Sequence, residues 1–311
     1  MQVTHGPIAP GSSRWALTIG NFDGVHRGHQ AMLERMAARA RAMQLPSCVL
    51  TFEPHPREFF TPATAPARLT RLRDKLELMA AAGVNRVHVA RFDARLAALA
   101  AERFVEDIVV RGLRAAWLLV GRDFRFGAKR GGDYALLEQL AARHGIVLEA
   151  MPEVALQGER VSSSAVRAAL AAGNLGAAQR LLGRPYAMSG RVAHGAKLGR
   201  ELGFPTANIV LRRRPPLAGI FVVECLIEGE ADWRWGVASV GRRPTVNPSA
   251  AMLLEVHLLD YAGELYRRHL QLRFLQKLRD EQKFDDLPAL RAAIARDAAQ
   301  ARTYFAKKTN A

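Results

Sequence analysis

The chain has 311 residues and a net charge of +16 at neutral pH, with 49% hydrophobic and 24% charged residues. This composition is typical of a globular protein and excludes a largely disordered or collagen-like chain. Two cysteines, Cys48 and Cys225, are too few for a disulfide framework. The sequence shows no secretory signal, and its most apolar stretch, Ala115–Val120, is too short to span a membrane. We therefore expect a cytoplasmic protein without a membrane partner.

The positive charge by itself would favour binding to nucleic acids or to nucleotide phosphates. The excess is spread over both halves of the chain, and 38 of the 45 basic residues are arginine, which a biased genomic composition also explains. The sequence contains no zinc-finger pattern and no aromatic string typical of RNA-binding modules. We expect no nucleic-acid partner, although a nucleic-acid-binding module stays an alternative, and duplex binding with a steep salt dependence would favour it.

The first half alternates between apolar runs of strand length and helical patterns, which favours a parallel sheet with helices on its faces. The predicted strands are Ala16–Phe22, Cys48–Phe52, Arg86–Phe92, Ala115–Gly121 and Ile146–Val154. The predicted helices are His29–Met43, Arg73–Ala82, Glu102–Arg114, Tyr134–His144, a helix after Ser163 and Leu175–Leu182.

The pattern changes near Pro185, where helices give way to short apolar runs separated by turn residues, as in a small antiparallel barrel. The predicted strands are Tyr186–Ala193, Ala207–Leu211, Gly219–Ile227, Arg234–Val240, Leu253–Leu259 and Leu270–Phe274. A final helix is predicted over Leu287–Phe305. The predicted fold class is α/β: a Rossmann-like domain over residues 1–184, and a β-barrel domain with a terminal helix over residues 185–311.

A glycine-rich turn, residues 20–29, joins the first predicted strand directly to a helix. The edge of the sheet where strands end is where open α/β folds bind ligands, and the helix N-terminus offers free N–H groups to a phosphate. His26 and His29 are spaced so that both rings can face one phosphate chain, and Gly28 keeps side-chain bulk away. A metal site formed by the two histidines, or two unrelated turn histidines, are the alternatives.

A second segment, Val161 to Arg167, begins a helix with three serines. Its hydroxyls can cap the helix or contact phosphate, and Arg167 follows one turn later. By itself this string is also that of an ordinary capped helix. Together with the first motif it resembles the HxGH and ISSTxxR signatures of the nucleotidyltransferase superfamily, with Val161 in place of Ile and Ser164 in place of Thr.

Two further strings, Phe52–Pro56 and Gly121–Gly127, follow predicted strand ends. With the other motifs they make residues 14–183 similar to the FMN adenylyltransferase module of prokaryotic bifunctional riboflavin kinase/FAD synthetases. Asp123 stands where that family often has Asn. The resemblance implies that histidines and an arginine stabilise charge on ATP as pyrophosphate leaves, and that glycines, serines and their neighbours bind ATP. The residues that would stabilise charge are His26, His29 and Arg167. The residues that would bind ATP are Gly20, Phe22, Asp23, Gly24, Gly28, Asp123, Ser163 and Ser164.

The second half begins with spaced glycines, Gly195, Gly199 and Gly203, with Lys197 between them. Such a loop can fold over phosphates through its backbone N–H groups, although a flexible connector has the same composition. The loop leads into the string GFPTAN, where Thr206 and Asn208 offer neutral oxygen ligands for Mg²⁺. This string resembles the riboflavin kinase signature, and the resemblance, which extends over residues 184–306, implies that Pro205 also belongs to the ATP site.

Glu255 lies in the predicted strand EVHLLD and shares one face with His257. A carboxylate in a cleft can act as a general base in phosphoryl transfer, whereas a solvated strand carboxylate is the plainer interpretation. The resemblance implies that Glu255 activates the ribityl hydroxyl of riboflavin. One departure is Tyr266–Arg267, where the family commonly has Tyr–Gly.

The resemblance as a whole implies a bifunctional enzyme. One domain would convert riboflavin and ATP to FMN, and the other would convert FMN and a second ATP to FAD and pyrophosphate, both with Mg²⁺. The expected partners are these small molecules and, in addition, a second copy of the chain. An adenylyltransferase with another acceptor, such as phosphopantetheine, is the nearer alternative, but it leaves the GFPTAN half unexplained.

Overall fold

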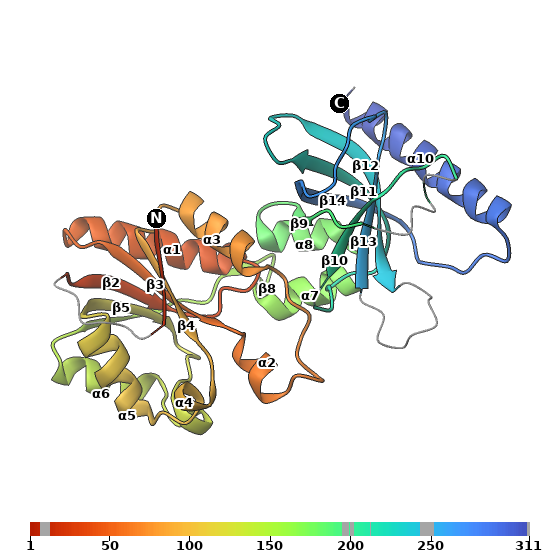
Figure 1. The fold of residues 1–311 in the computed structure, drawn as a ribbon. Coiled ribbons are helices and arrows are strands. Elements are labelled where there is room, and N and C mark those ends of the chain that lie inside the picture. Colours follow the sequence, from red (N-terminus) through yellow and green to blue (C-terminus); the bar gives the residue numbers. More distant parts are fainter. Residues whose placement is uncertain (7–12, 195–198, 200–201, 212, 243–251, 310–311) are drawn as a thin grey trace. The chain divides into compact units, whose positions relative to one another are not determined.

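The computed structural model describes residues 1–6, 13–194, 199, 202–211, 213–242 and 252–309. It divides into two compact units (Figure 1). The first contains residues 1–66 and 72–162, and the second contains residues 67–71 and 163–311. The first unit is an α/β structure and the second is a β-barrel with a terminal helix, so the predicted fold class is confirmed.

The first unit is built on a six-stranded sheet in the order β1-β4-β3-β2-β5-β6, and every strand pair in it is parallel. Four central strands are almost fully buried, because helices cover both faces and leave the sheet no solvated side. The strands are β1 (Gln2–His5), β2 (Trp15–Ile19), β3 (Ser47–Glu53), β4 (Arg86–Arg91), β5 (Ala115–Gly121) and β6 (Val147–Met151).

Two hydrophobic clusters hold the helices on this sheet. In Figure 1, α1 and α3 cover one face, while α5 and α6 cover the other. Leu33 and Met36 of α1 pack with Met79 of α3, and Val105 packs with Leu137 on the opposite side. The helices are α1 (Arg27–Ala42), α2 (Pro56–Phe60), α3 (Leu72–Ala81), α4 (Ala94–Ala97), α5 (Ala101–Arg103), η1 (Phe104–Gly112), η2 (Ala128–Arg130) and α6 (Tyr134–Arg143).

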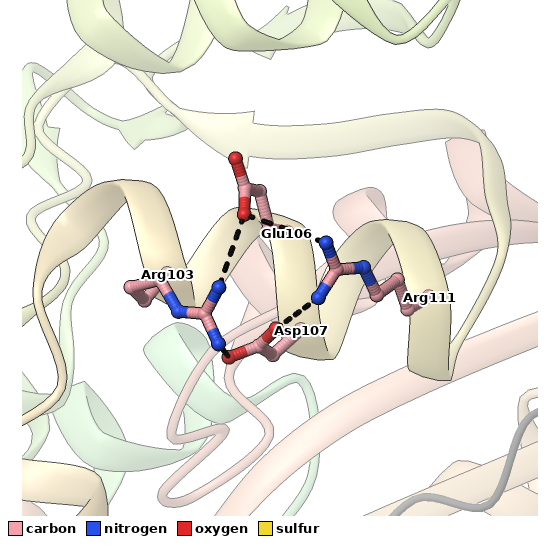
Figure 2. A network of polar contacts seen from close by, with 4 residues as sticks. All are labelled: Arg103, Glu106, Asp107 and Arg111. Atoms are coloured by element: carbon pink, nitrogen blue, oxygen red, sulfur yellow. Dashed lines mark hydrogen bonds and ion pairs between the residues drawn. The ribbon is translucent and has the colours of Figure 1, made fainter.

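The structure differs from the predicted helix Glu102–Arg114 in its winding, because residues Phe104–Gly112 form a π-helix. In a π-helix, residues five apart share a face. Figure 2 shows the result: Arg111 reaches Asp107 at 3.1 Å and also Glu106 at 3.8 Å, while Arg103 contacts the same two carboxylates at 2.9 and 3.4 Å. These side chains are at least 30% exposed, so each pair adds little stability alone.

The second unit is an antiparallel barrel in the strand order β10-β13-β12-β11-β14-β9. An isolated bridge between Ala193 and Asn208 brings the two edges together and nearly closes the barrel. The strands are β9 (Tyr186–Arg191), β10 (Ala207–Leu211), β11 (Gly219–Ile227), β12 (Trp233–Arg242), β13 (Met252–Leu258) and β14 (His269–Arg279).

The terminal helix α10 (Leu287–Thr309) packs on this barrel through Ala298, Ala301 and Phe305. Two more helices, α7 (Ser163–Ala171) and α8 (Leu175–Leu182), also belong to the second unit. Gly173, between the two helices, lies against the side chain of Lys277 from β14, and a Cβ there would lie 2.6 Å from Cδ of Lys277. The units therefore separate at residue 163, whereas the sequence pattern changes near 185, and the boundary at 184 stays a prediction.

Candidate active sites

The glycine-rich turn of the first unit lies between β2 and α1, as predicted. Phe22 and Val25 have positive φ angles of 49° and 40°, and Gly24 has a φ of 87°. Phe22 and Asp23 are buried, so the turn folds inward against the sheet. At Gly28 a Cβ would lie 3.2 Å from Nδ1 of His26, so a side chain there would crowd this ring.

The two histidine side chains of this turn stack on each other. Their ring centroids are 3.7 Å apart and their planes differ by 17°. His26 is the N-cap of α1, and its Nδ1 accepts a hydrogen bond of 3.3 Å from the backbone N–H of His29. The proton of a neutral His26 ring therefore lies on Nε2.

His26 is 6% exposed, and His29 is partly buried beside it. Burial, and after it the charges of His26 and Lys75, hold the pKa of His29 well below its usual range. Its Nδ1 is buried and has no hydrogen-bond partner among the described residues. A neutral buried imidazole beside a helix N-terminus suits an anionic ligand, because the arriving negative charge favours the protonated ring.

A lysine that the sequence analysis did not single out lies beneath this turn. Lys75 of α3 is 1% exposed, and its Nζ donates to the carbonyl oxygen of Asn21 at 2.7 Å and to Thr51 Oγ1 at 3.4 Å. The signal in the sequence is its position in the apolar stripe of α3, between Leu72 and Met79. A charged residue at a core position of an amphipathic helix needs a reason other than packing.

Asp123 lies in the turn that follows β5, where Phe124 N–H donates to the Gly121 carbonyl. Its carboxylate accepts a hydrogen bond of 2.6 Å from Arg160 of the small hairpin formed by β7 (Ala155–Leu156) and β8 (Glu159–Arg160). Both side chains are more than half exposed. The negative charge that replaces the family's usual Asn is therefore paired with an arginine.

Ser163, Ser164 and Arg167 lie in the first turns of α7, as predicted from their string. This helix belongs to the second unit, whereas the histidine pair belongs to the first. The Nε of Arg167 donates to the carbonyl oxygen of Ala67 at 2.6 Å, which fixes the base of its side chain within that unit. Their role in a shared adenylyltransferase site stays a prediction.

In the second unit, the loop before β10 folds back on itself. Phe204 N–H donates to the Gly199 carbonyl at 2.7 Å, and a Cβ at Gly199 would lie 2.5 Å from Phe204 O and 3.2 Å from Thr206 Oγ1. Gly203 has a φ of 84°, which few other residues adopt. The predicted residues Gly195 and Lys197 lie outside the described residues.

Asn208 and Glu255 are brought together by the register of the barrel. They are direct partners in the antiparallel pair of β10 and β13, and Ser239 of β12 is the partner of Glu255 on its other side. Directly opposite residues point to the same face of a sheet, with Cβ atoms about 5 Å apart. The predicted metal ligand and the predicted base thus lie side by side.

The loop is also fixed to β13. Nδ1 of His257 lies 2.9 Å from the carbonyl oxygen of Pro205, and the His257 ring meets Phe204 edge to face. Because His257 follows Glu255 by two residues, both side chains lie on the same face of β13. This contact holds Pro205 and the exposed Thr206 over the strand that carries the carboxylate.

The donor set here fits a magnesium ion. The Oδ1 of Asn208 is buried and has no hydrogen-bond partner among the described residues, so it is available as a ligand. The hydroxyl of Thr206 is a second neutral oxygen, and Mg²⁺ prefers oxygen ligands, often few from protein and several from phosphate and water. The described parts of the chain contain no cluster of three or more His, Cys, Asp or Glu side chains that could hold a metal.

Comparisons with known proteins agree with both halves. The family model "FAD synthetase" matches residues 9–165, and the family model "Riboflavin kinase" matches residues 182–305. The chain is 51% identical to the bifunctional riboflavin kinase/FMN adenylyltransferase of Escherichia coli K12 over 93% of this chain and 92% of that protein. It is 50% identical to the protein of the same name from Pseudomonas fluorescens over 98% of each chain.

A solved structure is similar over the full length. It is titled a macrolide-efflux protein from Streptococcus pneumoniae, and it matches 97% of this chain and 99% of its own with 26% identity and a TM-score of 0.81. Within the described residues, no helix combines the length and apolar character that a membrane crossing requires.

The two units thus define a two-domain transferase that acts on nucleotides, with a nucleotidyltransferase fold in one unit and a kinase barrel in the other. The chain belongs to the family of bifunctional riboflavin kinases/FMN adenylyltransferases. It is an enzyme of flavin coenzyme biosynthesis, and the family resemblance seen in the sequence is confirmed.

Proposed function

We propose that the second unit phosphorylates riboflavin through Glu255, Asn208 and Thr206, and that the first unit adenylylates the product through His26 and His29. The observation that carries this proposal is the register pairing of Asn208 with Glu255, because it sets a ligand for the nucleotide's metal beside a candidate base. ATP serves both steps, and riboflavin, FMN and FAD are substrate, intermediate and final product.

In the kinase step, the Glu255 carboxylate accepts the proton of the ribityl hydroxyl as that oxygen attacks the terminal phosphorus of ATP. The bond from this phosphorus to the bridging oxygen breaks, and ADP leaves. The pairing of β13 with β10 on one side and β12 on the other fixes the backbone from which this carboxylate projects. The Asn208 Oδ1 and the Thr206 hydroxyl are the protein ligands that we assign to Mg²⁺. When bound, this ion neutralises charge on the phosphates of ATP.

In the adenylyl transfer step, an oxygen of the FMN phosphate attacks the α-phosphate of ATP, and pyrophosphate leaves. The chain's contribution is electrostatic: Nε2–H of His26, the ring of His29 and the N–H groups at the start of α1 face the charge that builds on the phosphate chain. No covalent intermediate is needed. Arg167, Ser163 and Ser164 are assigned to the same nucleotide by their similarity to the family's second signature.

The reactants of both steps are small molecules of the cytoplasm, which is where we place the enzyme. We also keep the expectation that the chain can form a homo-oligomer.

A time course tests the function directly. Purified protein is incubated with riboflavin, ATP and Mg²⁺, and the three flavins are separated by chromatography. FMN should appear first and FAD later. FMN without FAD would support only the kinase assignment, and unchanged riboflavin with folded protein would contradict both.

A further inference from the structure

The ammonium group of Lys75 lies at the carboxyl edge of the parallel sheet of the first unit, where neither the motifs nor the predicted site residues account for it. It projects from α3 between two strand ends: Asn21 follows β2, and Thr51 is part of β3. Thr51 Oγ1 in turn donates to the same Asn21 oxygen at 3.3 Å. Two donors from separate elements therefore converge on one backbone carbonyl, at the start of the histidine turn.

The position of the Asn21 carbonyl affects the conformation of the whole turn. Asn21 directly precedes Phe22, the buried residue with a φ of 49°, and the chain reaches His26 four residues later. The Oδ1 of Asn21 is also buried without a hydrogen-bond partner among the described residues. Fixing the Asn21 peptide therefore fixes the direction in which the turn enters α1.

The charge of Lys75 also acts on the histidine pair. The titratable groups that act on His29 are His26, at the N-cap of α1, and Lys75, from α3; both favour its neutral form, in addition to burial. Lys75 thus supplies a permanent positive charge behind two rings whose charge depends on the ligand. In a buried site such a charge acts on a phosphate chain more strongly than it would in water.

We propose that Lys75 is a positioning residue for adenylyl transfer, which holds the Asn21 carbonyl and adds a fixed positive charge beneath the histidine turn. The proposal rests on the function assigned above to the first unit. It makes Lys75 necessary for FAD formation and irrelevant to riboflavin phosphorylation, because Lys75 and its partners Asn21 and Thr51 lie in the first unit.

Three substitutions separate charge from hydrogen bonding. K75M removes both, K75Q keeps a donor for Asn21 without the charge, and K75R keeps the charge. R35M is the matched control, because it removes one positive charge from an exposed pair with Glu149 in the same unit. We expect K75M and K75Q to lower kcat for conversion of FMN to FAD roughly 10- to 100-fold, K75R to recover most of it, and R35M to have no effect.

Two further readouts exclude a merely structural effect. Riboflavin phosphorylation by the same polypeptide should stay within about twofold of the wild type in every variant, because it depends on the other unit. In an NMR titration, the pKa of His29 should rise toward its ordinary value of about 6.5 in K75M and K75Q but not in R35M. This titration needs no turnover.

The outcomes distinguish the inference from the function on which it rests. A wild-type protein that forms no FAD contradicts the assigned function of the first unit, while the His29 titration still tests Lys75. An active wild type with K75M or K75Q equally active and an unmoved His29 overturns the role of Lys75 alone. If K75M does not fold, K75Q carries the test, because its amide can still donate to Asn21.

Discussion

The histidine pair and Glu255 lie in different units of the structure, so single substitutions should separate the two reactions. His29→Ala removes one ring of the stacked pair. We expect it to reduce FAD formation about 10²- to 10³-fold, the loss typical of a removed charge-stabilising group. FMN formation should continue. The measurement is the flavin time course, started once from riboflavin and once from FMN.

Glu255→Gln should give the reverse result. The amide keeps the size of the side chain but cannot accept the proton of the attacking hydroxyl, so riboflavin phosphorylation should fall about 10²- to 10⁴-fold. FMN supplied directly should still become FAD. A variant that phosphorylates riboflavin at the normal rate would leave Glu255 as a solvated strand carboxylate.

Arg267 stands where the family commonly has glycine, and its backbone conformation is one that glycine adopts more easily. It has a φ of 63°, in the left-handed region, and its N–H donates to the Val192 carbonyl at 3.1 Å. Glycine, which the family commonly has here, adopts this conformation without the strain of about 1–2 kcal/mol that other residues incur.

Arg267→Gly should therefore stabilise the second unit. Relief of strain exceeds the extra entropy of glycine in the unfolded chain, for a net gain of about 0.5–1 kcal/mol. The thermal transition of the second unit, followed in the full chain, should shift upward by roughly 2 °C. The contact of Arg191 with the Arg267 carbonyl uses the backbone, so it survives the change. A lower transition temperature would mean that the Arg267 side chain contributes more than the strain costs.

Among the elements, α10 is attached to the barrel by a buried ion pair in addition to its apolar contacts. Asp297 of α10 is 4% exposed, and it accepts from Nε and Nη2 of Arg279, the last residue of β14, at 3.0 and 2.7 Å. Such a two-point contact fixes both the distance and the rotation of the helix.

Asp297→Ala should destabilise the second unit by about 3 kcal/mol, because it leaves a mostly buried guanidinium without its carboxylate. Arg302→Ala is the control on the same helix: it breaks an exposed pair with Asp260, which is typically worth less than 1 kcal/mol. Denaturant unfolding of both variants measures the difference. Equal losses in the free energy of unfolding would show that the buried Asp297 pair stabilises the unit no more than the exposed Arg302 pair.

The elements were largely predictable from the sequence where a buried face requires apolar residues at regular spacing. The strands Ala115–Gly121, Ala207–Leu211 and Gly219–Ile227 were predicted to the residue. β1 was missed because it is a four-residue, mostly exposed edge strand whose pairing with β4 supplies its stability. The π-helical winding of η1 was missed because its buried residues Val105 and Val109 are four apart, a spacing that an α-helix also predicts.

The whole molecule is divided at residue 163, so α7 and α8 are part of the second unit. Leu175, Leu181 and Leu182 of α8 are buried, and α8 contacts β9 and β14. A fragment that begins at Ser163 keeps these contacts, while one that begins at Arg184 exposes the apolar surface beneath α8.

Both fragments should phosphorylate riboflavin, because Asn208 and Glu255 belong to the barrel itself. The fragment from Ser163 should unfold at the higher temperature. The comparison uses thermal unfolding together with FMN formation. Equal unfolding temperatures would favour the predicted boundary at 184, and an inactive pair of fragments would contradict an independent kinase unit.

The sequence by itself determined the family, the order of the two activities along the chain and most of the residues assigned to them. Short strings such as HxGH and GFPTAN carry this information because their chemistry needs fixed residue types at fixed spacing. The tertiary structure decided which distant residues meet. The pairing of Asn208 with Glu255 depends on strand register, and the approach of Lys75 to Asn21 depends on how α3 packs on the sheet. Neither follows from local sequence, because both are set by long-range packing of apolar faces.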